Sequence, residues 1–275
     1  MPRLKFLSWD IDPKIQPSVS NDFCHTISMI EYLVKPPQTS RCAKLIFHLV
    51  SSHQEIQPTR VDIDVLNQWC FLDENALTGP DAERRLMLSK VIIDAICAAA
   101  TIENFETNPF IDATKKLQES SFKITETWTK WIPLESTECE VGIQWEMDSF
   151  IDLYFATRNR KSKIIISLEL FLKTPLAPWQ IKKILGKFEK TSESEITLSS
   201  KENDSKWIYN TSTKAVTFAF PRAEVGDGHG HFILGKKLIY GDGVLKNTEE
   251  GIRNIKIAAS LGYPHAKNFL KTNLL

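Results

Sequence analysis

The stretch that decides the C-terminal part of the fold covers residues 234–270 and reads LGKKLIYGDGVLKNTEEGIRNIKIAASLGYPHAKNFL. Two segments with regularly spaced apolar residues flank a turn, Gly241–Val244, that contains two glycines. Glycine adopts positive φ without the steric penalty of a Cβ atom, so we expect a tight turn between two helices. Gly262 is placed to end the second helix, and Pro264 prevents its continuation. The stretch therefore predicts a helical hairpin.

The spacing of this hairpin is repeated upstream. Three residues of the preceding segment have the same mutual spacing as three at the end of the stretch: Gly226, Gly230 and Leu234 against Gly262, Ala266 and Leu270. The two sets are 36 residues apart (262 − 226). A period of 20–50 residues is typical of helical repeats, in which each unit buries its apolar face on a neighbour. We therefore expect the protein to work by presenting a surface to a partner.

These residues resemble a Sel1-like repeat, the bacterial relative of the tetratricopeptide repeat. The matching positions are Leu234, Gly235, Gly241, Gly243, Val244, Lys246, Ala258, Ala259, Gly262, Ala266 and Leu270. The chain departs from the family pattern at Leu238, Asn247, Gly251, Asn254 and Lys271. The resemblance covers one full unit and half of the preceding one, and it implies an αα-hairpin that caps or docks on a larger body. The alternative is an ordinary αα-hairpin without repeat ancestry.

Local signals place the second helix of the hairpin. Asn247 or Thr248 can cap its N-terminus, with Glu249 and Glu250 in the first turn, where acidic side chains are favourable. Its inner stripe is expected at Ile252, Ile255 and Ala259.

The first half of the chain mixes helices and strands. A helix capped by Asn21 or Asp22 should extend to Leu33 and end before two prolines. Residues 43–50 read as a buried strand, and Val61–Val65 as one half-exposed strand. The strongest helix should begin with a capping box of Thr78 and Asp81. Its inner stripe is Leu88, Ile92, Ala95, Ala99 and Ile102, and a further helix is expected at 109–117.

Alternation of apolar and polar residues dominates from 121 to 172. It predicts a four-stranded antiparallel meander with one buried face. A helix should follow at 177–188, then a polar region at 192–205 with room for one short strand, and then a hairpin built from 207–209 and 215–220. The fold class is α+β, an antiparallel sheet body packed with helices plus the C-terminal αα-hairpin. The predicted boundary separates a body, 1–222, from a repeat hairpin, 223–275.

Composition limits the classes of function. The chain has 34 basic and 34 acidic residues, so its overall charge does not favour nucleic acid or a membrane surface as a partner. The N-terminus lacks the apolar run of a signal peptide. Five cysteines are scattered singly without a C-x-x-C motif, which is typical of a reducing compartment. We expect a cytoplasmic protein; the composition leaves its oligomeric state open.

Several residues invite a chemical interpretation. His229 and His231 could chelate a metal, but a site needs a third ligand, and the repeat spacing explains both as part of a helix. Cys24 with His25, and Cys42 with His48 and His53, have no recognised metal-ligand spacing, so we do not expect them to bind a metal. Paired carboxylates can perform acid–base chemistry where they converge, but on strands they more often form a solvated face; the pairs are Asp10/Asp12, Asp62/Asp64, Glu138/Glu140 and Asp148/Asp152. Glu169 with Lys173 resembles part of a nuclease site only weakly. The sequence assigns no catalytic residue, cofactor or metal ligand.

Large aromatic residues are candidates for a binding surface. Tryptophan is enriched at interface hot spots but also fills cores. We expect most of Trp128, Trp131, Trp145 and Trp179 to be buried. Trp131, which stands just before Pro133 at a strand end, is the candidate for exposure.

Two classes of function remain. The first is a protein–protein interaction protein. In proteins similar to this one, a Sel1-like unit appended to an unrelated α+β body often serves such a role, for example in an immunity protein that neutralises a toxin delivered by a competing cell. The expected binding face is a basic patch on the hairpin, with a solvated helix face as the alternative: Lys236, Lys237, Arg253 and Lys256, with Glu249 and Glu250 at the other end of the second helix. The next candidate is the strand face around Trp131, Glu138 and Glu140. The second class is a hydrolase or nuclease that uses strand carboxylates, with the repeat as a regulatory arm.

Overall fold

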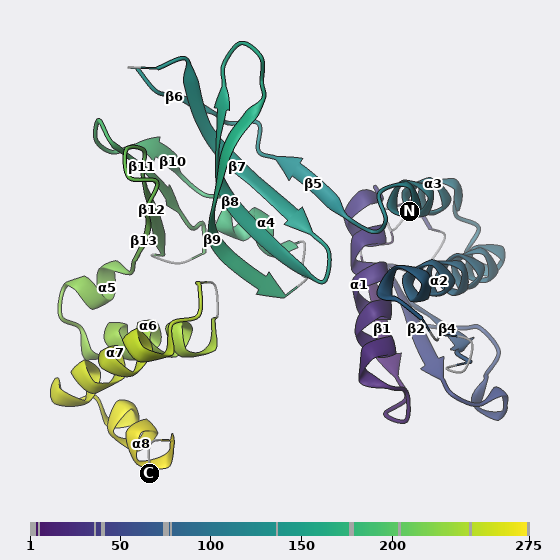
Figure 1. The fold of residues 1–275 in the computed structure, drawn as a ribbon. Coiled ribbons are helices and arrows are strands. Elements are labelled where there is room, and N and C mark those ends of the chain that lie inside the picture. The colour runs from purple at the N-terminus through teal and green to yellow at the C-terminus, as the bar shows by residue number, and fades with distance from the viewer. Residues whose placement is uncertain are drawn as a thin grey trace. The chain divides into compact units, whose positions relative to one another are not determined.

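The computed structural model divides into two compact units, Met1–Ile124 and Thr125–Leu275, whose elements are labelled in Figure 1. It describes residues 4, 6–35, 37–39, 42–73, 77, 79–135, 137–175, 179–202, 205–241 and 244–273. The boundary that the sequence suggests, after residue 222, falls inside the second unit. Thr78 and Gly243, which figure in the expected helix cap and turn, lie outside the described residues. The chain is α+β, as predicted, with helices and antiparallel sheets in unit 2, while the sheet of unit 1 also contains parallel pairs.

Unit 1 is a small sheet with helices. In chain order its elements are β1 (Phe6–Ile11), α1 (Pro17–Leu33), β2 (Lys44–Val50), the 3-10 helix η1 (His53–Glu55), β3 (Arg60–Asp62), β4 (Val65–Phe71), α2 (Asp81–Glu103) and α3 (Asn108–Glu119). The sheet has the order β1-β2-β4-β3. The pairs β1–β2 and β2–β4 are parallel and β3–β4 is antiparallel. α1 contacts β1 and α2 contacts β4, and the buried core includes Leu45, Phe47 and Leu49 of β2.

Three local predictions in unit 1 are corrected by the structure. α1 begins at Pro17, so Asp22 is not its cap but a buried residue inside the helix. Asp22 instead receives Arg84 at 2.8 Å and Arg85 at 3.2 Å from α2. The expected single strand 61–65 is a hairpin of β3 and β4, because Ile63 has a φ of 58° and turns the chain there. Ile102 is exposed, whereas the other members of the predicted α2 stripe are buried.

Unit 2 begins with two antiparallel sheets. The first contains β5 (Ile124–Thr127), β6 (Ile132–Pro133), β7 (Cys139–Met147), β8 (Phe150–Asn159) and β9 (Ile165–Pro175). Its order is β5-β7-β8-β9, and β6 pairs with β7. After α4 (Trp179–Ile184), the second sheet has the order β10-β11-β12-β13, formed by β10 (Phe188–Lys190), β11 (Glu195–Ser199), β12 (Lys206–Asn210) and β13 (Val216–Ala219). The predicted meander and closing hairpin are confirmed. The helix predicted over 177–188 ends at Ile184, and Phe188 belongs to a strand; its predicted first two residues, 177 and 178, lie outside the described residues.

An aromatic core joins these two sheets. Phe155 of β8 is fully buried, and its ring centroid lies 4.9 Å from that of Phe171 and 5.1 Å from that of Tyr209 on β12. Phe188 of β10 completes the cluster at 6.4 Å from Phe155. One face of β7 and β8 therefore packs into the core. The alternate residues of those strands form the opposite face, which carries the candidate site described below.

The C-terminal helices are α5 (Pro221–Glu224), α6 (Gly228–Tyr240), α7 (Thr248–Ser260) and α8 (Pro264–Asn273). The local signals are confirmed at three points. Gly241 ends α6 in the left-handed region, the side chain of Asn247 caps α7 by accepting from the Glu250 amide, and Gly262 has a φ of 87°. The buried stripe of α7 is shifted from the predicted one: it comprises Gly251, Asn254, Ile255 and Ala258.

Two glycines set the separation of α6 and α7. A Cβ atom on Gly235 would lie 2.8 Å from the Gly251 carbonyl oxygen and 2.7 Å from the Ile255 side chain. A Cβ on Gly251 would lie 2.8 Å from the Gly235 carbonyl oxygen. The two backbones approach too closely for any side chain at these positions, so glycine is required at both of them for the helices to pack at this distance.

Candidate functional site

The hairpin residues expected to form a basic patch lie on α6 and α7. Lys236, Arg253 and Lys256 are exposed and Lys237 is half-buried. Arg253 is paired with Glu250 at 2.6 Å and with Glu249 at 3.8 Å. The acidic residues expected at the far end of α7 therefore neutralise part of the patch. The structure thus differs from the segregated charge pattern that the sequence suggested, and a binding role for this face stays a prediction.

Trp131 is held in a fixed position on the outer face of the first sheet of unit 2. The residue comes just before β6, and its indole ring covers Gly142 of β7. A Cβ on Gly142 would lie only 2.6–2.8 Å from the ring carbons, so the ring occupies the space that a side chain would fill. The Arg158 guanidinium carbon, from β8, lies 3.5 Å from the ring centroid. This is a cation–π contact, and it leaves the indole half-buried rather than enclosed.

Glu140 holds the Arg158 side chain in place. Residues 140 and 158 are directly opposite each other in the β7–β8 register, and the Arg158 Nε donates to Glu140 at 2.7 Å. Lys163 donates to the same carboxylate at 2.9 Å. Partial burial raises the pKa of the Glu140 carboxyl, but hydrogen bonds and charges from Lys163 and Arg158 outweigh this, so the pKa lies below its ordinary value of 4.5. Glu140 therefore remains ionised and keeps Arg158 over Trp131.

Glu138 lies at the same end of the sheet but in a different role. Its side chain is 63% exposed and pairs with Lys161 in the β8–β9 turn. The structure thus brings Trp131 and Glu140 together through Arg158, whereas Glu138 belongs to the charged rim. We call the four residues Trp131, Glu140, Gly142 and Arg158 the Trp131 cluster.

Apolar side chains continue this face toward β9. Gly142, Ala156 and Leu168 lie in one row across β7, β8 and β9. On β9 and the turn before it, the exposed fractions of Ile164, Ile166 and Leu168 are 67%, 59% and 36%. Leu168, which lies opposite Ala156, therefore places exposed apolar surface on the outer face with the fixed tryptophan and arginine.

The sequence interpretation missed Arg158, Gly142 and the apolar edge. The short break at 147–149 predicts a tight hairpin of β7 and β8, but it does not determine which residue lies opposite Glu140. A turn centred on Asp148 would place Ala156 there, whereas the observed turn pairs Met147 with Ile151 and places Arg158 opposite Glu140. The covering of Gly142 by Trp131 had no signal in the local pattern.

The remaining candidates for chemistry are distributed over both units. His231 Nδ1 lies 2.9 Å from the Asn254 side-chain oxygen, and the His229 ring packs on Tyr263, so both histidines join α6 to its neighbours. Within the described residues, no group of three or more His, Cys, Asp or Glu side chains is placed to hold a metal ion. None of the five cysteines, all of which the structure describes, takes part in a disulfide, and burial raises the pKa of Cys70 to about 12.

The carboxylate pairs are largely engaged by other polar groups. Asp62 accepts from Arg60 and from Asn67, each at 3.0 Å, and Asp64 is exposed in the β3–β4 turn. Lys173 pairs with Asp152 at 3.4 Å, across β8 and β9, and Glu169 lies opposite Phe155 in the same ladder. Asp148 lies in the β7–β8 turn, where its backbone N–H donates to the Phe150 carbonyl.

Asp10 and Asp12 line a cavity of about 260 Å³ at the carboxyl ends of the parallel strands β1 and β2. His48, Glu55 and Trp69 are also in its lining. His48 Nδ1 is 3.3 Å from Asp10, and its ring stacks on Trp69 at 4.5 Å. Hydrogen bonds from the Ser51 hydroxyl and the Lys14 amide lower the pKa of Asp12. Crevices outside the carboxyl ends of parallel strands are where ligands bind in open α/β sheets, so this cavity is a second candidate site.

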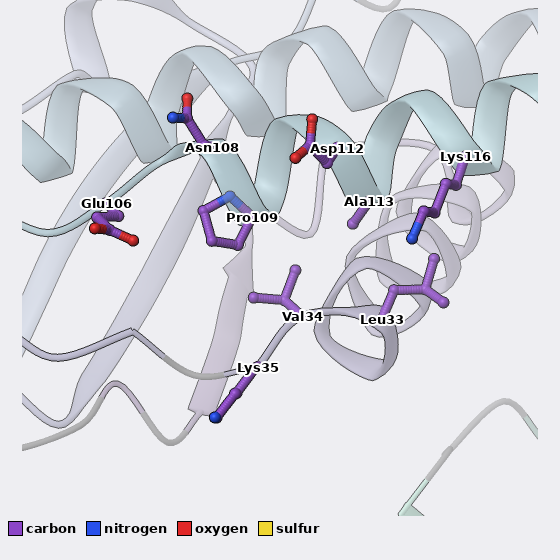
Figure 2. A pocket seen from close by; sticks show the side chains of 9 residues that line it. All are labelled: Leu33, Val34, Lys35, Glu106, Asn108, Pro109, Asp112, Ala113 and Lys116. Atoms are coloured by element: carbon purple, nitrogen blue, oxygen red, sulfur yellow. The ribbon is translucent and has the colours of Figure 1, made fainter.

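A larger hollow of about 360 Å³ lies where the end of α1 meets the start of α3. Figure 2 shows Leu33 and Val34 from the end of α1 facing Pro109 and Ala113 of α3. Charged residues of both signs surround this apolar floor: Lys35, Glu106, Asp112 and Lys116. The hollow is open, and its charges balance, so it indicates no particular ligand.

Comparison of this chain with protein-family models, with curated proteins and with solved structures found no match. Among the helices that the structure describes, none has the length and apolar character needed to cross a membrane.

Proposed function

We propose that this chain is a protein–protein interaction protein, and that it binds its partner through the Trp131 cluster. The observation that carries the proposal is the position of Trp131, whose half-buried ring lies against Gly142 and 3.5 Å from the Arg158 guanidinium carbon. Tryptophan and arginine dominate the binding energy of interfaces, and side chains fixed before binding lose less entropy when a partner arrives. The cluster is therefore suited to act as a preformed anchor.

The surroundings of the cluster fit the usual anatomy of an interface. Interfaces have an apolar centre and a polar rim. Ile166 and Leu168 supply exposed apolar surface on the β9 side. The ion pair of Glu138 and Lys161 supplies exposed charges at the end of the sheet. A partner with an apolar segment beside an acidic group would complement Leu168 and Arg158 together.

The specific form of this proposal is a bacterial, cytoplasmic immunity protein whose partner is a toxin domain. Its support is the resemblance of the C-terminal helices to a Sel1-like repeat. Gly226 and Gly262, 36 residues apart (262 − 226), both have positive φ, and α6 and α8 each begin two residues later. The close contact of α6 with α7 at Gly235 and Gly251 also fits a hairpin that buries its apolar face on a neighbouring helix.

The experiment uses the full chain and the product of the adjacent reading frame as the test partner. Affinity is measured by calorimetry for the unchanged chain, Trp131→Ala and Arg158→Ala, and toxicity is measured in cells that produce both proteins. We expect each substitution to weaken binding at least tenfold, which corresponds to about 1.4 kcal/mol, and to reduce protection.

Arg60→Ala is the matched control, because Arg60 also lies over a tryptophan, Trp69, at 5.3 Å. A charge reversal of Lys237, Arg253 and Lys256 tests the α6–α7 face separately. Loss of binding in that variant alone would move the interface to the helical hairpin. Unchanged affinity for Trp131→Ala and Arg158→Ala would refute the proposal.

The cavity beside Asp10 favours a second candidate function, a hydrolase or nuclease that uses strand carboxylates. Asp10 lies beside His48 at 3.3 Å, and Glu55 completes an acidic lining. A carboxylate next to an imidazole can serve in acid–base catalysis. The purified chain is assayed with phosphate ester, peptide and nucleic-acid substrates. Any activity should be lost in Asp10→Asn and kept in Asp152→Asn, whose carboxylate pairs with Lys173 in the other unit. Activity that survives Asp10→Asn would contradict this second function.

A further inference from the structure

The cavity beside Asp10 lies entirely within unit 1, and its lining is acidic. Three carboxylates contribute to that lining: Asp10, Asp12 and Glu55. The side chain of Asp10 is 76% exposed. Hydrogen bonds from the Ser51 hydroxyl and the Lys14 amide lower the pKa of Asp12, so Asp12 is ionised at neutral pH. A ligand that enters this cavity therefore meets negative charge.

The positive charges near the cavity do not balance its three carboxylates. The ammonium group of Lys14 lies 3.1 Å from Oε1 of Glu55, and its side chain is 70% exposed. Arg60, on the strand β3, is already paired with Asp62 at 3.0 Å. The lining that the structure describes contains no lysine or arginine, and its one titratable base is His48. The three carboxylates therefore face the charge of Lys14 and, when it is protonated, that of His48, which leaves an excess of negative charge.

One carboxylate oxygen of the lining has no donor. Oε2 of Glu55 is enclosed by protein atoms, and within the described residues it has no hydrogen-bond partner. Lys14 occupies only the other oxygen, Oε1. A buried acceptor without a donor costs folding free energy, which a ligand that donates a hydrogen bond would recover. The cavity thus offers an acceptor as well as negative charge.

The geometry of the lining favours an organic cation over a metal ion. Within the described residues no three His, Cys, Asp or Glu side chains are placed to hold a metal ion, so the carboxylates do not converge on one point. A primary ammonium group carries three N–H donors and can reach separate acceptors. Apolar side chains in the lining, such as Leu49, Val50 and Trp69, can pack against an aliphatic stem.

The volume of the cavity limits the size of the ligand. It is about 260 Å³, just below the range of about 300–1,000 Å³ that is typical of sites for drug-sized molecules. The ligand is therefore small, or only one side chain of a larger molecule enters.

We propose that this cavity binds a primary ammonium group on an aliphatic stem, with Asp10, Asp12 and Glu55 as its acceptors. The inference rests on the site of the second candidate function and deepens it, because it names the substrate class. That class is compounds with a lysine-like amine, since the same carboxylates would repel phosphate esters and nucleic acid. A free diamine and the lysine side chain of a peptide share this chemistry, so the test includes both.

The first test measures the binding of matched probes to the full chain by calorimetry. Putrescine represents a free diamine, and Nα-acetyl-lysine amide represents a peptide lysine. Nα-acetyl-norleucine amide is the control, because it keeps the aliphatic stem and lacks the ammonium group. We expect at least one amine to bind at least tenfold more tightly than the control, and the tighter amine identifies the source. No binding of either amine at millimolar concentration, equal binding of the control, or tighter binding of inorganic phosphate would overturn the proposal.

The second test removes single charges from the lining. Asp10→Asn and Glu55→Gln keep the shape of each side chain, and each should weaken binding of the tighter amine several-fold. Asp64→Asn is the matched control, since Asp64 is an exposed carboxylate of the same unit, in the β3–β4 turn. Unchanged affinity in both cavity variants, or an equal loss in Asp64→Asn, would overturn the proposal.

A third measurement locates the amine without any substitution. The indole N–H signals of the 15N-labelled chain are followed by NMR while the tighter amine is added. We expect the signal of Trp69 to move, because Trp69 lines the cavity, and the signals of the buried Trp145 and Trp207 in unit 2 to stay in place. Movement of the unit 2 signals alone would contradict the site.

These outcomes separate the inference from the second candidate function. Amine binding in the cavity without any hydrolytic activity would support the inference and contradict the enzyme. Hydrolysis of phosphate esters that Asp10→Asn abolishes, with no binding of either amine, would support the enzyme and overturn the inference.

Discussion

Replacing Gly142 with alanine tests whether Trp131 is held as the structure indicates. The added methyl group would lie 2.6 Å from Cδ2 and 2.7 Å from Cε3 of the indole. Carbon atoms in contact are about 3.5–4.0 Å apart, so the ring must move by about 1 Å, which disturbs its contact with Arg158. Such overpacking costs about 1–3 kcal/mol, and the weakened cation–π contact adds about 0.5–1 kcal/mol. Replacing a strand glycine by alanine returns about 0.5–1 kcal/mol. The steric term is larger, so we expect a net destabilisation of about 1–3 kcal/mol.

The assay is urea unfolding of unit 2 within the full chain, followed by hydrogen exchange of the β7 and β8 amides so that unit 1 does not contribute. The same substitution is then made in a Trp131→Ala background, which removes the clash. There we expect Gly142→Ala to be neutral or to stabilise by up to about 1 kcal/mol, because only the backbone effect of the glycine remains. Equal destabilisation in both backgrounds, or none in the unchanged chain, would refute the position assigned to the indole ring.

Three further predictions concern packing and charge. Phe155→Ala should destabilise unit 2 by about 3–5 kcal/mol in urea unfolding, because it leaves a cavity among buried aromatic rings; a loss under 1 kcal/mol would contradict this core. Gly235→Ala should separate α6 from α7 and speed amide exchange in both helices, since its methyl group would lie 2.8 Å from a carbonyl oxygen; unchanged exchange would show that the helices are further apart. The pKa of Glu140 is lower in the folded chain, so its contribution is present at neutral pH and is lost as pH falls below about 4.5. Glu140→Gln should therefore flatten the fall in stability on acidification, and an unchanged acid profile would argue against the pair with Arg158.

Local sequence patterns predicted elements whose stability comes from near neighbours. The alternation through Val141, Ile143 and Trp145 identifies the buried face of β7, and all three side chains are buried. Asn247 and Gly241 were recognised as cap and turn because their roles depend only on the adjacent backbone.

The errors come from contacts between distant residues. Asp22 resembles a helix cap in the local sequence, but the helix begins earlier and the carboxylate pairs with arginines more than 60 positions away. The parallel pairing of β1 with β2 and of β2 with β4 is also non-local, and the strand patterns do not encode it. Ile63 was placed in a strand because Val61, Ile63 and Val65 alternate with their neighbours in the pattern of a half-exposed strand. It turns the chain instead, with a φ of 58° that β-branched residues rarely adopt.

The candidate site likewise combines residues that local sequence identifies with residues that only long-range contacts reveal. Trp131 and Glu140 were named from residue type and position, which are visible in the sequence. Arg158 follows only from the register of β7 and β8, and Gly142 follows only from the close approach of the indole ring. The sequence could therefore suggest this strand face as a binding surface. The contacts of Trp131 with Arg158 and Gly142 could be recognised only once the pairing of β7 with β8 was known.

The most direct test of the central claim is oxidative footprinting of the chain with and without its partner, read at single tryptophans. Trp9 provides the internal control, because its side chain is 36% exposed and lies in unit 1. If the partner binds the Trp131 cluster, its addition should slow oxidation of Trp131 several-fold and leave the rate at Trp9 unchanged. Equal oxidation rates at Trp131 in the free and bound chain would show that the partner binds elsewhere.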